Sequence, residues 1–446
     1  MKKLATSIFT FLTIFSLVLG EDLPARPEQL QFPPLEYQPP EPDQLRVELD
    51  NGIPVYIAED RILPLITLGI SFRGGKYMEP FGKEGLASLT GTVWRTGGAG
   101  NLSASELDEE LDFLAANLMT GLGSTSGSVM LNLLSKDFDR GLELLMDVLT
   151  KPRFEQHRFS KAKDDFYASM KRRNDQTRAI ESREWQRLIY GEDFWMNRLP
   201  TQASVESITH RDLVEFHRLL LNPKDIVIAV AGDFSRDEMI AKLNASLGRL
   251  QAAADPVPPV PQPHHSFEPG VYLVDKKDVN QGRVSIGHIG YKRPFEGEFD
   301  IAVANDVLGG GSFTSWIVSR VRSDEGLAYS AGSRFILGTT IPGAFRASFQ
   351  SKSSTCARAA DLILQLVDKL RNEGISREEL ETSRNSFIQT FPNRFQSKYQ
   401  TVALFAEDEL WERPSDYWRR YRDRIAQVTL ESAKAAAQKY ICLLYT

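Results

Sequence analysis

The order of apolar and polar residues near the start of the chain predicts paired strands. Apolar residues alternate with polar ones over residues 47–49 and 55–57, on either side of Asp50-Asn51-Gly52. Alternation around a turn of this composition indicates a β-hairpin. A longer apolar run, residues 65–72, predicts a further strand.

Helical patterns follow these strands. Ser103 and Glu106 have the spacing of a capping box, and leucines recur behind them every three or four residues: Leu107, Leu111, Leu114 and Leu118. Ser376 and Glu379 repeat the capping device later in the chain. Because strands and helices come in blocks instead of strict alternation, we predict an α+β fold class.

Similar patterns recur a little over 200 residues apart. Ser135-Lys136 and Ser351-Lys352 each precede a leucine-bearing helical pattern, and Thr209 and Thr429, 220 positions apart, each open a helix. A repeat this long indicates a duplicated domain and not a solenoid. A Pro-rich stretch, residues 251–269, separates the two copies.

The amino-terminal residues have a different composition. Two lysines precede an uncharged apolar run, residues 8–19, and Gly20 follows it. This is the pattern of a secretory signal, since the run is short for a membrane span; an uncleaved anchor is the alternative. We therefore expect an exported, periplasmic protein with five segments. They are a signal peptide (1–20), a Pro-rich arm (21–45), an amino-terminal domain (46–250), a linker (251–269) and a carboxy-terminal domain (270–446).

Composition excludes few functions. The net charge of −6 gives no electrostatic reason to expect a nucleic-acid partner. Apolar residues make up 42% of the chain, which is ordinary for a globular protein. Cys356 and Cys442 are the only cysteines, and the sequence leaves open whether they pair.

A spaced motif in the first domain carries a family resemblance. Gly75, Glu79, Gly82 and Gly85-Leu86-Ala87 form a lead-in to residues 88–92. The lead-in resembles that of the pitrilysin/insulinase family of zinc peptidases, where H-x-x-E-H comes next. In that motif the two histidines bind zinc and the glutamate polarises the metal-bound water.

This chain departs from the family at the metal site. The resemblance places the two histidine positions at Ser88 and Thr92, the glutamate position at Gly91, and the third ligand at Ser169, 77 positions after Thr92. Hydroxyl groups are poor zinc ligands beside imidazole and carboxylate. The resemblance therefore implies a vacant metal site, no cofactor bound by this chain, and no hydrolysis by this chain alone.

The histidines offer no replacement site. None stands in an H-x-x-x-H pair with a glutamate between. His210 and His217 are seven positions apart and could share a helix face, and we expect both to be surface residues. His264-His265 lies in the linker and is expected to be solvated.

The second domain resembles the family's second-half signature. Arg322 and Tyr329 stand seven positions apart, behind Gly309-Gly310-Gly311. The resemblance implies that the Arg and the Tyr reach a zinc site and stabilise the tetrahedral intermediate, and that the glycines handle substrate. The alternatives are an Arg that packs the domain, a core Tyr and a simple turn at a helix start.

The resemblance also implies an assembly. Family members place two such domains as a clamshell, and some work as two-chain peptidases in which one chain lacks zinc. This chain would be the non-zinc subunit of a heterodimer. It would close a peptide chamber and present Arg322 and Tyr329 to a homologous partner that carries the zinc. The alternative is an inactive scaffold or peptide-binding protein of the same fold.

Overall fold

The computed structural model describes residues 36–251, 256–264, 268–311 and 313–441. The chain divides into two units, residues 1–38 and 39–446, and every described helix and strand lies in the second. The predicted signal peptide, most of the Pro-rich arm and Cys442 lie outside the described residues. No helix of the described residues is long and apolar enough to cross a membrane.

The first sheet has six strands in the order β1-β2-β6-β3-β5-β4. They are β1 (Arg46–Glu48), β2 (Pro54–Glu59), β3 (Leu65–Arg73), β4 (Asn117–Leu122), β5 (Ser126–Leu134) and β6 (Ile226–Gly232). β2 and β6 run parallel, and the other neighbours run antiparallel. Every residue of β6 is buried, as expected for a strand covered on both faces. β1 and β2 confirm the predicted hairpin.

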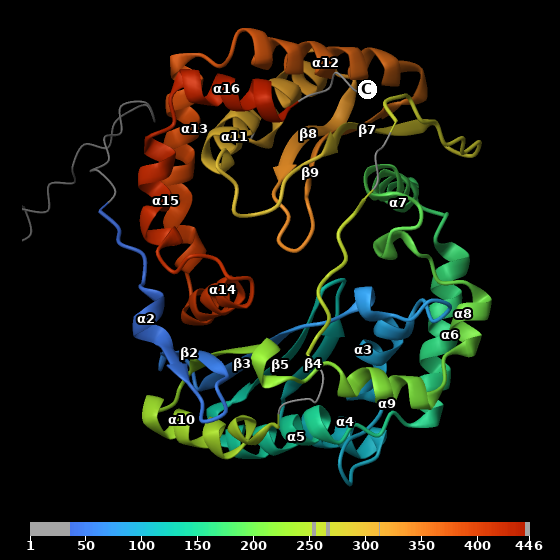
Figure 1. Cartoon of the computed structure of the whole chain (residues 1–446), viewed down its shortest axis with the longest axis vertical. Coiled ribbons are helices and arrows are strands. Elements are labelled where there is room, and N and C mark those ends of the chain that lie inside the picture. The colour runs from blue at the N-terminus through green and yellow to red at the C-terminus, as the bar shows by residue number, and fades with distance from the viewer. Residues whose placement is uncertain (1–35, 252–255, 265–267, 312, 442–446) are drawn as a thin grey trace, which may run out of the picture. The chain divides into compact units, whose positions relative to one another are not determined.

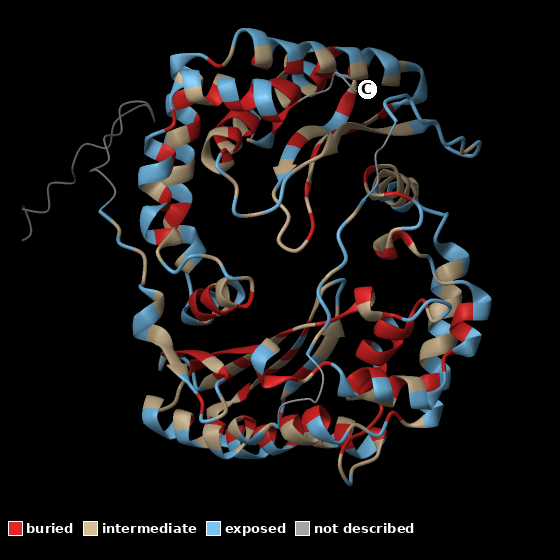
Figure 2. Ribbon diagram, in the orientation of Figure 1, coloured by how far each residue is buried: buried red, intermediate tan, exposed pale blue. Residues whose placement is uncertain are grey.

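The first half also contains helices, most of which lie around this sheet, whereas α7 lies beside β7 (Gln281–Ile289), as Figures 1 and 2 show. They are α2 (Pro42–Leu45), α3 (Leu86–Thr96), α4 (Ala104–Phe113), α5 (Phe138–Thr150), α6 (Gln156–Arg172), α7 (Thr177–Tyr190), α8 (Gln202–Ser207), α9 (His210–Arg218) and α10 (Arg236–Ala245). The capping box of Ser103 and Glu106 is confirmed. The leucine spacing extended the helix too far: Ala115 has a φ of 48° and Leu118 belongs to β4. A left-handed residue ends a helix, so Leu118 joins the sheet.

The second sheet has three antiparallel strands among the described residues, in the order β7-β9-β8. The strands are β7 (Gln281–Ile289), β8 (Ala328–Ile336) and β9 (Ala344–Lys352). The helices are α11 (Glu298–Asn305), α12 (Cys356–Asn372), α13 (Arg377–Thr390), α14 (Lys398–Leu410), α15 (Tyr417–Ala426) and α16 (Leu430–Tyr440). Two segments, η7 (Asp306–Gly310) and η8 (Val318–Asp324), are π-helical. The α+β fold class is thus confirmed.

The repeat is visible as corresponding elements. A short 3₁₀ turn joins a strand to a long helix in each half, at Ser135–Asp137 and at Ser353–Thr355. Ser351-Lys352 ends β9 ahead of a leucine-bearing helix, as predicted. The two 3₁₀ turns align Ser135 with Ser353, so the match drawn from the sequence is offset by two residues. Thr209 and Thr429 both form capping boxes at the start of their helices, as predicted.

Each half contributes one helix that packs against the sheet of the other half. α14 of the second half packs against β2, β3 and β6 of the first sheet, where Phe405 meets Tyr56 with ring centroids 6.0 Å apart. α7 of the first half packs against β7 of the second sheet, and its Trp185 ring lies 5.3 Å from the Arg346 guanidinium. Each sheet therefore depends on a helix from the other half.

Candidate functional site

The lead-in holds the start of α3. The buried Glu79 carboxylate accepts hydrogen bonds from the backbone N–H groups of Ala87 at 2.8 Å and Gly85 at 3.2 Å. Burial raises the pKa of Glu79, and these bonds together with the nearby Lys76 oppose that rise. An acidic group at a helix start also interacts favourably with the helix dipole. The lead-in therefore has a structural role that does not need zinc.

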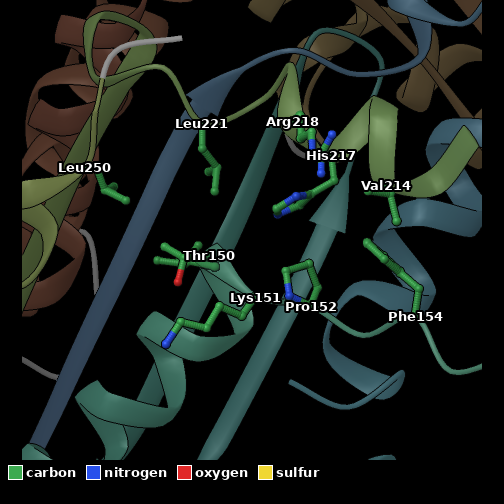
Figure 3. Close-up of a pocket in the computed structure, with 10 residues that line it drawn as sticks. Thr150, Lys151, Pro152, Phe154, Val214, His217, Arg218, Leu221 and Leu250 are labelled. Carbon is green, nitrogen blue, oxygen red and sulfur yellow. The ribbon is translucent and has the colours of Figure 1, made fainter. Parts of the chain in front are cut away.

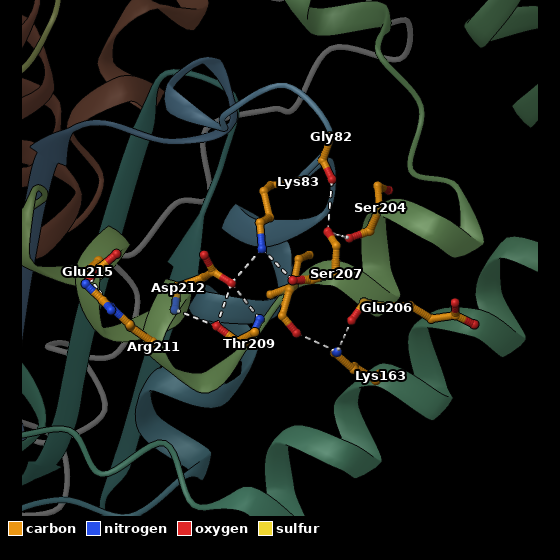
Figure 4. Close-up of polar contacts among 11 residues, drawn as sticks. Gly82, Lys83, Lys163, Ser204, Glu206, Ser207, Thr209, Arg211, Asp212 and Glu215 are labelled. Atoms are coloured by element: carbon orange, nitrogen blue, oxygen red, sulfur yellow. Dashed lines mark hydrogen bonds and ion pairs between the residues drawn. The ribbon is translucent and has the colours of Figure 1, made fainter.

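A polar network ties the same loop to α6, α8 and α9 (Figure 4). The Lys83 ammonium donates to the Asp212 carboxylate at 2.8 Å and to the Ser207 carbonyl. The Ser207 hydroxyl donates to the Gly82 carbonyl at 3.0 Å. Lys163 of α6 donates to backbone carbonyls at the junction of α8 and α9. The loop before α3 is thus anchored to three other helices.

The positions of the family's metal site lie on two adjoining helices. Ser88 and Thr92 are exposed one turn apart on α3, and the Thr92 hydroxyl donates to the Ser88 carbonyl at 2.9 Å. Ser169 is exposed on α6, which packs against α3. The fold therefore keeps the elements that would carry ligands, while the side chains are hydroxyls.

Gly91, the position of the family's glutamate, has no room for a side chain. A Cβ atom built on Gly91 would lie 2.9 Å from the backbone nitrogen of Leu122 in β4. The Thr120 hydroxyl of β4 donates to the Gly91 carbonyl at 2.9 Å. α3 and β4 thus approach each other more closely than any side chain at position 91 would permit.

Zinc does not fit this donor set. The ligand positions offer hydroxyl groups and the base position offers no side chain, whereas zinc sites use thiolate, imidazole and carboxylate. Among the described residues, no group of three or more His, Cys, Asp or Glu side chains is placed to hold a metal ion. We therefore derive no reaction step through a metal on this chain.

Arg322 and Tyr329 lie against each other. Arg322 comes from the π-helical η8 and Tyr329 from β8. The Arg322 guanidinium carbon lies 5.0 Å from the Tyr329 ring centroid and 4.8 Å from that of Phe313. Tyr329 is 85% exposed, so the alternative of a core tyrosine is wrong. Within the described residues neither Arg322 nor Tyr329 forms a hydrogen bond or an ion pair, which leaves their donors available to a ligand.

Phe313 was not anticipated from the sequence. It is an exposed aromatic residue, and the Arg322 guanidinium contacts its ring as well as that of Tyr329. Cation–π contacts of this kind contribute about 0.5–1 kcal/mol at exposed sites. The available signal was an aromatic residue shortly after the glycine run, next to residues already singled out.

The glycines 309–311 are explained by close packing. A Cβ atom on Gly309 would lie 2.7 Å from the backbone nitrogen of Ser333 in β8. Ser333 in turn donates to the Asn305 side chain at 2.8 Å in a buried position. The role of Gly309, Gly310 and Gly311 in substrate binding stays a prediction.

His210 and His217 do share a face of α9, but only one of them is at the surface. Both rings meet the Phe154 ring edge-on. His217 is buried, 4.7 Å from the Trp94 ring, so its predicted surface position was wrong. Apolar neighbours of α3 enclose it, a tertiary contact that helical spacing does not reveal. Burial lowers the pKa of His217 to about 4.

A small cavity lies beside His217. It measures about 310 Å³ and is lined by residues of α5, α9 and the stretch between α5 and α6 (Figure 3). The His217 Nε2 atom is buried without a hydrogen-bond partner among the described residues. His264 is exposed in the linker as expected, and His265 lies outside the described residues.

Comparison with known proteins decides the family. Residues 207–387 match the model of the Peptidase M16 inactive domain. The chain is an M16 peptidase homologue. The resemblance of this chain to the pitrilysin/insulinase family is thereby confirmed.

Relatives of this M16 homologue include chains with different names. It is 26% identical to the "Non-peptidase homolog YmxG" of Helicobacter pylori, over 77% of this chain and 78% of that one. It is 22% identical to the "Zinc protease PqqE" of the same organism, over 82% and 83%. A crystal structure of a peptidase M16 inactive domain from Pseudomonas fluorescens superposes with a TM-score of 0.80 at 20% identity, covering 90% of this chain and 95% of that one. These matches fit a non-catalytic member of the M16 family.

Proposed function

We propose that this chain is the non-zinc subunit of a two-chain peptidase. It would close a peptide chamber and supply Arg322 and Tyr329 to the active site of a zinc-bearing homologue. The observation that carries the proposal is the pair formed by the half-buried Arg322 and the exposed Tyr329, whose donors have no partner in the described chain. Both side chains can therefore donate to a ligand outside their own fold without breaking an existing contact.

The chemistry of the pair suits a carbonyl oxygen that gains charge. A guanidinium offers a planar fork of N–H donors, and a phenol offers one O–H donor. Donors held near a developing oxyanion stabilise the transition state more than the substrate. Zinc on the partner would supply the activated water and polarise the scissile carbonyl. The role of this chain would be to orient the two donors.

The relatives support a paired arrangement. Helicobacter pylori has both a chain named a non-peptidase homologue and a chain named a zinc protease, and both are similar to this one. The substrate would be an extended polypeptide bound partly by strand addition. We further propose that the protein is exported to the periplasm, because residues 1–20 have the composition of a signal.

The alternative proposal is an inactive scaffold or peptide-binding protein. The observation that favours it is the lead-in, where Glu79 and Lys83 stabilise the fold without any catalytic group. A scaffold would keep such contacts and would have no need for free donors at Arg322 and Tyr329.

Co-expression separates the two proposals. The chain would be produced with a homologue from the same genome that carries an intact H-x-x-E-H motif, and the mixture examined by size-exclusion chromatography with light scattering. We expect a one-to-one complex. A zinc-bearing homologue that elutes alone, with full peptidase activity, would contradict the proposed function and favour the alternative of an inactive scaffold.

A further inference from the structure

A second cavity lies in the carboxy-terminal half, apart from Arg322 and Tyr329. It measures about 850 Å³ and is bounded by residues 293–302, by residues 335–339 around the end of β8, and by α13, α14 and α15. Pockets for small ligands are typically about 300–1,000 Å³. The cavity is thus large enough for one or two amino-acid residues of a ligand.

One wall of this cavity is aromatic. The Tyr417 and Trp418 rings of α15 lie 4.8 Å apart, and Trp418 and Tyr421 lie 5.7 Å apart. Phe299 of α11 stacks on Tyr417 at 6.0 Å. A continuous set of rings favours an apolar or aromatic group on the ligand.

Three guanidinium groups of the lining, those of Arg293, Arg394 and Arg424, have no carboxylate partner among the described residues. Arg394 lies over the Trp418 ring at 5.1 Å and the Tyr421 ring at 5.4 Å. Arg293 donates to the Thr339 hydroxyl at 3.1 Å, while its Nε atom is buried without a partner. A guanidinium with free N–H groups is well suited to bind a carboxylate through two parallel hydrogen bonds.

Arg293, Arg394 and Asp408 all line this cavity. Burial raises the pKa of Asp408 to about 7, and the charges of Arg293 and Arg394 both oppose that rise. Arg413, by contrast, already has a partner, since its Nη1 atom lies 2.8 Å from Asp408 Oδ1. Arg293, Arg394 and Arg424 are therefore the groups left to hold a ligand's negative charge. We assign that role to Arg293, whose Nε atom is buried without a partner, and to Arg394, which lies over the aromatic rings.

The charge of the lining restricts the ligand. Carboxylates such as Glu296, Glu298 and Glu407 line the cavity together with the arginines. A multiply charged anion such as a nucleotide phosphate would meet these carboxylates and be repelled. A ligand with a single carboxylate and an apolar body is repelled less, because it carries one negative charge instead of several.

We propose that this cavity binds the carboxy-terminal residue of a peptide. The side chain of that residue would lie on the ring wall of Tyr417, Trp418 and Tyr421. Its free carboxylate would accept hydrogen bonds from Arg293 and Arg394. The inference deepens the proposed function by naming a peptide end as ligand, but it concerns this chain alone and needs no zinc-bearing partner.

The test uses two matched probes on the purified chain. Gly-Gly-Phe with a free carboxylate and Gly-Gly-Phe amide would be titrated by isothermal calorimetry. We expect saturable binding of the acid and at least tenfold weaker binding of the amide. Equal affinity of the two probes, or no binding of the acid, would overturn the proposal.

Variants of Arg394 make the test specific. Arg394→Gln is expected to weaken binding of the acid at least tenfold, and because Arg394 is exposed the variant should fold. Arg394→Lys keeps the charge without the planar fork and should be intermediate. Arg211→Gln, which removes an exposed ion pair with Glu215 on α9, is the matched control and should bind as the parent does. Unchanged binding in Arg394→Gln would contradict the assignment.

Discussion

The guanidinium of Arg322 lies 5.0 Å from the centre of the Tyr329 ring, and the two come from different elements, η8 and β8. Segments of π-helix are rare and are frequent at functional sites. The ring holds the guanidinium by a cation–π contact, which limits the directions in which its N–H groups point. The two residues therefore form one unit.

Removing either donor should reduce the activity of the mixed complex. We expect Arg322→Ala to lower peptide turnover by about 100–1,000-fold, the range for loss of one oxyanion donor. Tyr329→Phe keeps the ring and removes only the hydroxyl, so it should also lower turnover while Arg322 stays in place. Peptide hydrolysis by the co-purified pair measures both effects.

The control for this pair is Arg320→Ala. Arg320 lies on the same π-helical segment but is paired with Glu325 at 3.1 Å, so turnover should change little. Full activity in Arg322→Ala and Tyr329→Phe, with the complex still formed, would reduce the pair to surface packing and favour the scaffold.

Restoring a side chain at position 91 should destabilise the fold. The Cβ of Gly91→Ala would approach the Leu122 backbone nitrogen to 2.9 Å, and such overpacking costs about 1–3 kcal/mol. That cost exceeds the gain of about 1 kcal/mol for replacing Gly by Ala in a helix. Urea unfolding should therefore show a lower free energy of unfolding, and Gly91→Glu should be worse.

Ser88→Ala provides the comparison, since Ser88 is exposed on the same helix and surface changes usually stay within about 0.5 kcal/mol. If Gly91→Ala proved as stable as the parent chain, the close approach of α3 and β4 would not exclude a side chain at position 91.

Glu79 should stabilise the fold through its oxygen atoms and not through its charge. Glu79→Ala leaves the Gly85 and Ala87 N–H groups without their acceptor, which costs about 1–3 kcal/mol. Glu79→Gln keeps an acceptor oxygen and should unfold at nearly the same denaturant concentration at neutral pH. Equal losses in both variants would contradict this account.

Glu79 should also make the free energy of unfolding depend on pH. The pKa of Glu79 is raised in the folded chain, so the folded state holds this proton more tightly than the unfolded state does. Its contribution to stability is complete below the unfolded pKa and is lost as the pH rises through the folded pKa. Glu79→Gln cannot ionise, so its stability relative to the parent should improve between about pH 4 and pH 7. Urea unfolding at both pH values measures this difference.

His217 should make the fold sensitive to acid. Its pKa is about 4 in the folded chain because the ring is buried, against an ordinary value of about 6.5. The unfolded state therefore binds the proton first, and stability falls as the pH drops from about 6.5 to about 4, by on the order of 3 kcal/mol.

His217→Phe removes this titration and should flatten the stability profile over that interval. His210→Gln, which changes an exposed histidine on the same face of α9, should keep the fall in stability that His217 causes. Thermal unfolding followed at several pH values measures both. A profile of His217→Phe as steep as the parent's would show that another group titrates there.

Turns and helix caps could be predicted because the contacts that form them join residues only a few positions apart. The hairpin at residues 50–52 and the capping boxes at Ser103, Thr209 and Ser376 depend on neighbours one to three positions away. The metal-site positions could be located because the lead-in that precedes them is intact.

Other features depend on residues far apart in the chain. The burial of His217 follows from packing on Trp94. The packing of α7 and α14, each against the sheet of the other half, follows from contacts between the halves. The approach of Leu122 to Gly91 needs β4 to cross α3. The pairing of Arg322 with Phe313 as well as Tyr329 depends on a π-helical turn. None of these leaves a periodic pattern in the sequence.

The proposed two-chain peptidase is tested by titrating this chain into a fixed amount of a zinc-bearing homologue from the same genome and measuring peptide hydrolysis. This chain alone should cleave nothing, with or without added zinc, because Ser88, Gly91, Thr92 and Ser169 stand where ligands and base are needed. We expect turnover to rise with added chain and to reach a plateau at one chain per zinc-bearing subunit. Hydrolysis by this chain alone, or turnover that stays constant while the complex forms, would contradict it.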